Sequence, residues 1–302
     1  VPKILCADFL PAVELPSMTP DIIDIDGNPL VISMSSLSDD SKFWFGDLES
    51  LVGSYENWIE SQKDDISKLE PHYRSTAESH IAKCQQCAER MWQGIHILKR
   101  NEEAEKAFEI ANKAMYLQQL ATKKIERRPL VWNGVYVASA QPNNSRQAYP
   151  NQLLSESFSD LGNWRAFQIA FFLMSISGIV DEESSSDHEV VDLIWFPTGG
   201  GKTEAYLGVA AFYMAYQRLL MNSHKGLDRD GTSVFMRYTL RMLTTQQFQR
   251  AASLILALEH IRKQEVKGGN RILGDTRFSL GLWIGGDGAP NRVKEAHSRV
   301  LK

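Results

Sequence analysis

One stretch near the middle of the chain constrains the fold more than any other. An apolar run of strand length, residues 190–196, is followed directly by Pro197-Thr198-Gly199-Gly200-Gly201-Lys202-Thr203-Glu204. The residues after it, 205–220, predict a helix. A continuous apolar run of this length predicts a strand buried on both faces, as in a parallel sheet. A strand, a glycine-rich turn, Lys-Thr and a helix in this order predict a cradle for phosphate groups.

The chemistry of this turn favours a nucleoside triphosphate and its metal ion. Glycines allow backbone N–H groups to converge on phosphate oxygens, and a helix N-terminus adds unpaired donors and a favourable dipole. We expect Lys202 to reach the β- and γ-phosphates of ATP and Thr203 to ligate Mg²⁺, which makes both candidate catalytic residues. The residues expected to bind the cofactor here are Thr198, Gly199, Gly200, Gly201, Lys202, Thr203 and Glu204. The alternative is a glycine-rich turn that binds nothing.

Composition excludes several classes of protein. The net charge of −4 gives no global attraction to nucleic acid, so any such binding must come from local patches. The three cysteines are too few for a disulfide framework, which predicts a cytoplasmic location, and the start of the chain has no secretory signal pattern. The longest apolar stretch, 169–180, is too short to span a bilayer, so we expect no membrane partner.

The N-terminal half predicts helices without evident catalytic chemistry. Residues 1–40 predict an extended segment, and apolar residues at helical spacing predict a helical bundle domain over residues 41–128. Within it, Cys84 and Cys87 form a single C-x-x-C without a second pair, which favours free thiols over half of a zinc site. The Pro-, Asn- and Ser-rich residues 129–160 predict a linker.

Residues 161–302 alternate predicted strands and helices. After the first strand, residues 232–238 and 278–284 predict two more, with a long helix at 243–263 between them. This alternation predicts right-handed crossovers and a parallel sheet that binds its ligands at the strand C-termini. The predicted fold class is therefore α/β, with a helical domain followed by a partial P-loop NTPase domain.

Further residues lie where a nucleic-acid motor would need them. Gln168 is on a predicted helix about 30 residues before the turn, and its amide could both donate to and accept from an adenine edge. Hydroxyl, arginine and amide side chains after the second strand could hold a sugar-phosphate backbone without reading sequence. The candidate nucleic-acid-binding residues are Thr239, Arg241, Thr244, Gln246, Gly285 and Gly286. Each could instead be a helix cap, a solvated side chain or an ordinary turn.

These motifs resemble those of superfamily 2 helicases. The strict G-x-x-x-x-G-K-[ST] pattern fails at Phe196, but the variant A-x-T-G-x-G-K-T of that superfamily fits from Thr198 onward. Residues 238–246 resemble helicase motif Ia, P-T-x-x-L-x-x-Q, with Tyr238 in the proline position, and Gly285-Gly286 resembles motif Ib. Residues 164–168, 192–206 and 236–248 look like the DrmA family, the helicase subunits of the DISARM anti-phage system.

The resemblance implies a large ATP-driven DNA-binding protein with a RecA-like lobe. It also implies a partner subunit, a methyltransferase and the restriction of phage. A D-E-x-[HD] tetrad does not follow the third predicted strand, so we expect that motif and a second lobe beyond Lys302 and expect these 302 residues not to turn ATP over. Two alternatives stay open: a nucleotide-switched scaffold that docks a partner protein, and another P-loop motor of a restriction system.

Overall fold

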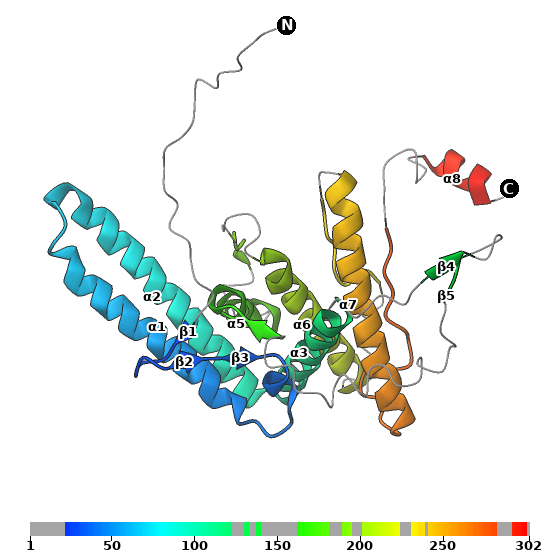
Figure 1. Ribbon diagram of the computed structural model, residues 1–302, viewed down its shortest axis with the longest axis horizontal. Helices are drawn as coiled ribbons and strands as arrows, with labels where there is room; N and C mark the ends of the chain where they lie inside the picture. The colour runs from blue at the N-terminus through cyan, green and yellow to red at the C-terminus, as the bar shows by residue number, and fades with distance from the viewer. Residues whose placement is uncertain are drawn as a thin grey trace, which may run out of the picture.

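The computed structural model describes residues 22–122, 130–132, 137–139, 162–180, 189–194, 201–223, 231–238, 241–282 and 292–300. These residues are mostly helical, and their strands form three two-stranded antiparallel sheets (Figure 1). The helical character of the N-terminal half is therefore confirmed.

Short strands precede the first long helix. The strands β1 (Ile22–Ile23) and β2 (Pro29–Leu30) pair as an antiparallel hairpin. Gly27 takes a φ of 82° in its turn, a conformation that glycine adopts without steric cost. The strand β3 (Ile32–Ser33) pairs with β6 (Asn163–Trp164), which lies far away in the sequence. A 3₁₀ turn, η1 (Ser36–Ser38), then leads to the first helix.

Three helices follow, as the apolar spacing predicts. They are α1 (Trp44–Ile66), α2 (Pro71–Arg100) and α3 (Glu102–Thr122). Pro71 opens α2, where its missing N–H costs no hydrogen bond. The side chain of Asn101 accepts a hydrogen bond of 2.8 Å from the Ala104 backbone N–H and so caps the start of α3.

The second half contributes four more helices to the described structure. They are α5 (Ala166–Val180), α6 (Lys202–Ser223), α7 (Arg241–Lys267) and α8 (Val293–Val300). The first three confirm the helices predicted around residues 164–179, 205–220 and 243–263. Within the predicted linker, β4 (Leu130–Trp132) and β5 (Val137–Ser139) form a third antiparallel pair.

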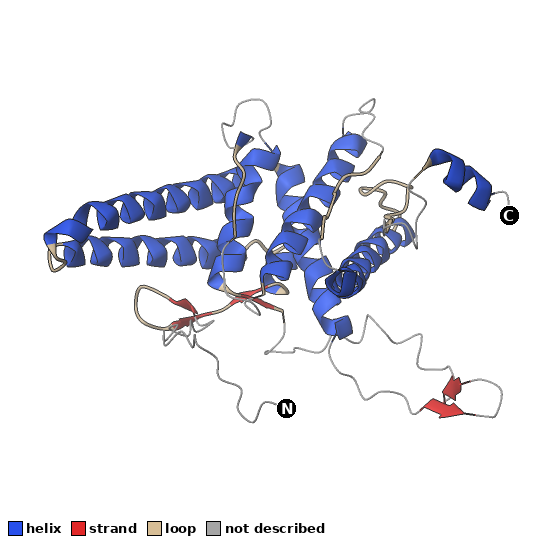
Figure 2. Ribbon diagram, turned by 90° about the horizontal axis from the view of Figure 1, so that it is seen from above, coloured by secondary structure: helices blue, strands red, loops and turns tan. Residues whose placement is uncertain are grey.

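The helices α1 and α2 form an arm that projects from the packed helices. Both views show them side by side and antiparallel, with their connection far from the other elements (Figures 1 and 2). Ile59 is buried between them, whereas described side chains nearer the tip, such as Leu69 and Tyr73, are exposed.

The core continues from the first half of the chain into the second. Helix α3 packs against both α6 and α7, and α2 packs against α5. Aromatic rings join these elements. The ring centroid of Phe108 in α3 lies 5.0 Å from that of Phe172 in α5, and the Phe172 centroid lies 5.8 Å from that of Phe212 in α6. The predicted domain boundaries stay predictions.

The described residues contain no parallel sheet, so that part of the expected fold class stays a prediction. The described residues 190–194, 232–238 and 278–282, where strands were predicted, have no regular secondary structure and pair with no other described strand. Their apolar side chains also lack the covering layers that a parallel sheet requires, since Val191 is 93% and Phe235 is 82% exposed. Of the helices that the structure describes, none is both long and apolar enough to cross a membrane.

Candidate functional site

The segment that leads into the glycine-rich turn is anchored to the arm. Arg90 of α2 donates two hydrogen bonds to the Asp192 carboxylate, of 2.8 and 3.0 Å, and a third of 3.1 Å to the Met174 carbonyl of α5. A bidentate arginine–carboxylate pair fixes the relative orientation of the two side chains as well as their distance. The approach to the turn is therefore tied to α2 and α5 together.

The turn ends directly at the start of α6. Gly201 has a φ of 86°, and the next residue, Lys202, is the first of the helix. The Glu204 backbone N–H donates to the Gly201 carbonyl over 3.2 Å, which closes the first turn. Lys202, Thr203 and Glu204 thus lie in the first turn of a helix, where the helix dipole favours an anion. Thr198, Gly199 and Gly200 lie outside the described residues.

Gln168 of α5 fastens the end of this turn. Its side chain is 4% exposed; its Nε2 donates to the Gly201 carbonyl over 2.7 Å, and its Oε1 accepts from the Arg165 backbone N–H over 2.9 Å. A Cβ at position 201 would lie 2.6 Å from that Nε2, and the φ of 86° is one that other residues rarely adopt, so both favour glycine here. Contact of this amide with an adenine edge stays a prediction, and in the structure the amide holds the end of the glycine-rich turn.

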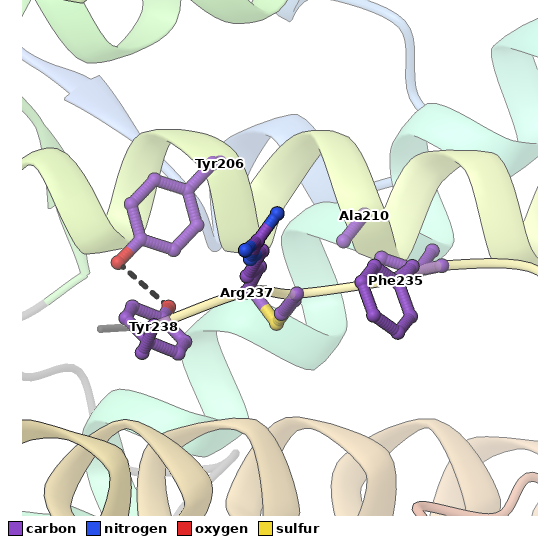
Figure 3. A pocket seen from close by; sticks show the side chains of 7 residues that line it. Tyr206, Ala210, Phe235, Arg237 and Tyr238 are labelled. Atoms are coloured by element: carbon purple, nitrogen blue, oxygen red, sulfur yellow. Dashed lines mark hydrogen bonds between the residues drawn. The ribbon is translucent and has the colours of Figure 1, made fainter. Parts of the chain in front are cut away.

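The Thr203 hydroxyl belongs to a chain of three hydroxyl groups. Tyr206, one turn further along α6, donates to Thr203 Oγ1 over 3.0 Å, and Tyr238 donates to the Tyr206 hydroxyl over 3.1 Å. Figure 3 shows the two tyrosine hydroxyls pointing toward each other. Burial, with a smaller contribution from Tyr206, raises the pKa of Tyr238 above its ordinary value, so its hydroxyl is neutral and able to donate at pH 7.

An ion pair ties the same turn of α6 to α7. Arg250 of α7 pairs with Glu204 Oε1, and the Arg250 backbone carbonyl accepts a hydrogen bond of 2.8 Å from Gln118 of α3. The second carboxylate oxygen, Glu204 Oε2, is buried and has no hydrogen-bond partner in the described structure. It faces Gly201, since a Cβ there would lie 3.4 Å from it. A buried oxygen left unsatisfied in this way calls for a water or an ion.

The described residues fit Mg²⁺ and a phosphate group. Thr203 and Glu204 offer hard oxygen atoms, which Mg²⁺ prefers. The Thr203 hydroxyl accepts one hydrogen bond and keeps a second lone pair for a metal ion. The absence of a Cβ at Gly201 leaves room for the Gln168 amide, which holds this end of the turn.

A shallow hollow of about 340 Å³ lies beside the hydroxyl chain, between α6 and the extended residues 234–238. Figure 3 shows Phe235, Arg237 and Tyr238 along that segment, with Tyr206 and Ala210 across from them. The hollow is small for a nucleotide and its lining is mainly apolar. We therefore place the candidate site at the start of α6 rather than in the hollow.

The structure describes only part of the predicted nucleic-acid surface. Arg241 is the first residue of α7, Thr244 follows in its first turn, and Gln246 is exposed one turn later. Thr239, Gly285 and Gly286 lie outside the described residues. Contact of this surface with nucleic acid stays a prediction.

Two residues of the candidate site, Tyr206 and Arg250, were not predicted from the sequence. Tyr206 could have been found, because a residue three positions after Thr203 shares its helix face. No local sequence pattern indicates Arg250, because its partner Glu204 is 46 residues away in the sequence.

The C-x-x-C pair of α2 contains free, half-buried thiols, as predicted. Burial, followed by the charge of Cys84, raises the pKa of the Cys87 thiol, which opposes reactivity as a thiolate. In the part of the chain that the structure describes, His, Cys, Asp and Glu side chains form no group that could hold a metal ion by themselves.

Comparison with known proteins gives one informative match. No protein-family model matches the chain. The chain is 33% identical over 296 residues to the DISARM protein DrmA of Bacillus paralicheniformis. That alignment covers 95% of this chain but 24% of the relative, so the chain spans about a quarter of the length of the curated protein it matches.

Proposed function

The chain is a homologue of the DISARM protein DrmA. On this premise we propose that it is the nucleotide-binding part of an ATP-dependent DNA helicase or translocase of superfamily 2. The whole protein would act in bacterial anti-phage defence. The observation that carries the proposal is the start of α6. There, Gly201 at positive φ leads directly into Lys202 and Thr203, and Gln168 holds the turn in place.

Each described residue has a role in binding the triphosphate. The positive charge of Lys202 and the dipole at the start of α6 would attract and orient the β- and γ-phosphates. Thr203, with Glu204 beside it, would hold Mg²⁺, which neutralises the charge of the phosphates when bound. Gln168 positions the turn and could offer its remaining N–H to a base.

The order of elements supports a RecA-like lobe in the whole protein. Extended residues 190–194 and 232–238 precede α6 and α7, as strands precede helices in an open α/β sheet. The start of α7, with Arg241, Thr244 and Gln246, would contact the DNA backbone without reading its sequence. Such a protein would work in the cytoplasm, where phage DNA is present.

A second function, the docking of a partner subunit, is favoured by the projecting arm. Its tip exposes Leu69 and Tyr73, and the side chains beyond Ile59 contribute little to the core. A nucleotide-switched scaffold would need the same site at α6 but no turnover. Another P-loop motor of a restriction system would need the same site and would turn ATP over. Turnover therefore separates the motor from the scaffold.

The first prediction tests Lys202 in the full-length protein. Replacing Lys202 with alanine removes the positive charge at the phosphates, so we expect at least a tenfold loss of ATP-analogue affinity, measured by fluorescence titration, and loss of DNA-stimulated hydrolysis. Lys263→Ala, an exposed position on α7, is the matched control and should leave both unchanged. Unchanged nucleotide binding in Lys202→Ala would refute the proposed site, whereas binding without any DNA-stimulated hydrolysis in the parent protein would favour the scaffold. The 302 residues alone should bind nucleotide weakly without turning it over.

A further inference from the structure

The hydroxyl chain Thr203–Tyr206–Tyr238 joins two parts of the molecule with different proposed tasks. Thr203 lies at the proposed metal site, and Tyr238 directly precedes the residues proposed to contact DNA. Usual versions of motif Ia have proline at the position of Tyr238, and proline has no side-chain hydroxyl. The link is therefore a feature of this chain rather than of the motif.

We propose that Tyr206 and Tyr238 are positioning residues that couple DNA binding at the start of α7 to Mg²⁺–nucleotide binding at Thr203. This inference rests on the proposed function. By linkage, DNA should raise the affinity for the metal–nucleotide complex by the same factor by which that complex raises the affinity for DNA.

The hydrogen bonds of the chain run in one direction, from Tyr238 to Thr203. A tyrosine hydroxyl has one proton and can accept further hydrogen bonds. Tyr238 donates its proton to Tyr206, and Tyr206 donates to Thr203 over the shorter of its two contacts, since Gln247 Oε1 lies further away at 3.5 Å. Thr203 accepts one hydrogen bond and keeps its own proton and a second lone pair. Tyr206 thus fixes which face of the Thr203 oxygen is left for the metal ion.

A second contact makes the two segments move together. Arg250 of α7 pairs with Glu204, which directly follows Thr203. The first turn of α6 is therefore bonded to Tyr238 on one side and to α7 on the other. A displacement of residue 238 or of α7 upon DNA binding would act on Thr203 and Glu204 directly.

The test uses Tyr206→Phe and Tyr238→Phe in the full-length protein, because each change removes one oxygen and keeps the ring. Two quantities are measured by titration with a fluorescent, non-hydrolysable ATP analogue. The first is the Mg²⁺ concentration at which binding of the analogue is half-maximal. The affinity for the analogue in the presence of a chelator gives the metal-free reference. The second is the ratio of analogue affinities with and without a single-stranded oligonucleotide. Tyr213→Phe, on α6 but outside the hydroxyl chain, is the control.

We expect Tyr206→Phe to raise the half-maximal Mg²⁺ concentration about fivefold, the equivalent of one lost hydrogen bond, and to leave metal-free binding unchanged. Tyr238→Phe should reduce the oligonucleotide effect toward a ratio of one. The double variant should be no worse in its Mg²⁺ requirement than Tyr206→Phe alone, because Tyr238 acts on Thr203 only through the Tyr206 hydroxyl.

Two outcomes would overturn the inference, and they are distinguishable. If Lys202→Ala abolishes analogue binding while both tyrosine variants keep the parent's Mg²⁺ requirement and oligonucleotide effect, the coupling is wrong and the proposed function stands. If Lys202→Ala leaves analogue binding intact, the proposed function fails and the coupling fails with it.

Discussion

At the scale of single residues, Glu259 shows how one carboxylate can hold a loop that has no regular structure. It accepts hydrogen bonds from Arg262 Nη2 and Nε, at 2.6 and 2.8 Å, and from the Phe278 backbone N–H at 3.1 Å. Arg262 in turn donates to the carbonyls of Gly274 and Asp275, at 3.3 and 3.1 Å. The pair therefore fastens residues 274–278 to α7.

This arrangement predicts a loss of stability in acid. Hydrogen bonds from Arg262 lower the pKa of Glu259 below its ordinary value of 4.5. A carboxyl with a lowered folded-state pKa stabilises the fold above its unfolded-state pKa, and this contribution is lost as pH falls below about 4.5. Glu259→Gln should cost about 1–3 kcal/mol at pH 7 and weaken the acid dependence, as measured by urea unfolding at pH 7 and pH 4. Asp275→Asn, in the exposed pair with Arg271, is the control and should change neither value. An equal loss at both pH values in Glu259→Gln would contradict the assignment.

The site residues differ in how far sequence could predict them. Lys202 and Thr203 were placed at a helix start because glycines followed by Lys-Thr have a local mechanism, and the helix does begin at Lys202. Gln168 was selected from its distance to the turn, but its hydrogen bond to Gly201 depends on how α5 packs beside α6, which no local pattern encodes. Tyr238 and Arg250 acquire their roles through contacts that span 32 and 46 residues.

At the scale of elements, the close approach of α2 and α5 depends on Gly94. A Cβ at this position would lie 2.2 Å from the Leu173 carbonyl oxygen and 3.0 Å from its carbon. These atoms are backbone, so a rotamer change cannot relieve the overlap. The same approach places α2 where Arg90 can reach Met174 and Asp192.

A matched pair of substitutions tests this packing. Gly94→Ala should lower the free energy of unfolding by roughly 2–3 kcal/mol, because the two helices must separate. Gly53→Ala, in α1, has nothing within 4 Å of its new Cβ and should raise stability by about 0.5–1 kcal/mol, because alanine favours a helix. Denaturant midpoints of both variants provide the measurement. If the two substitutions shift the midpoint in the same direction, the close contact does not hold in solution.

Helices were predictable from the sequence because their signal is local, whereas the sheet was not. Apolar spacing, Pro71 and Asn101 together place α1, α2 and α3 to within a few residues. Strand formation at residues 190–194 or 232–238 requires a neighbouring strand, and an apolar run such as the one around Val191 carries no information about which neighbour it has. Likewise, the composition of residues 129–160 indicates a linker, whereas the structure contains the β4–β5 pair there.

At the scale of the whole molecule, a buried hydrogen bond joins the predicted helical domain to the predicted α/β domain. Asn112 of α3 is fully buried; its Oδ1 accepts from Trp164 Nε1 over 2.7 Å, and its Nδ2 donates to the Phe108 carbonyl over 2.9 Å. Trp164 is part of β6, which pairs with β3 near the start of the chain. Polar contacts of this kind, within an apolar core, make the two halves depend on each other for stability.

This dependence predicts that the two halves unfold together. Asn112→Ala leaves the buried Trp164 N–H without its partner, at a cost of about 1–3 kcal/mol. If α3 and α6 share one cooperative core, amide hydrogen exchange measured by mass spectrometry should accelerate by a similar factor in both helices, although the substitution is in α3 alone. Asn57→Ala, at an exposed position of α1, is the control and should accelerate neither. Acceleration confined to α3 would mean that the halves are separate domains, as the sequence alone predicts.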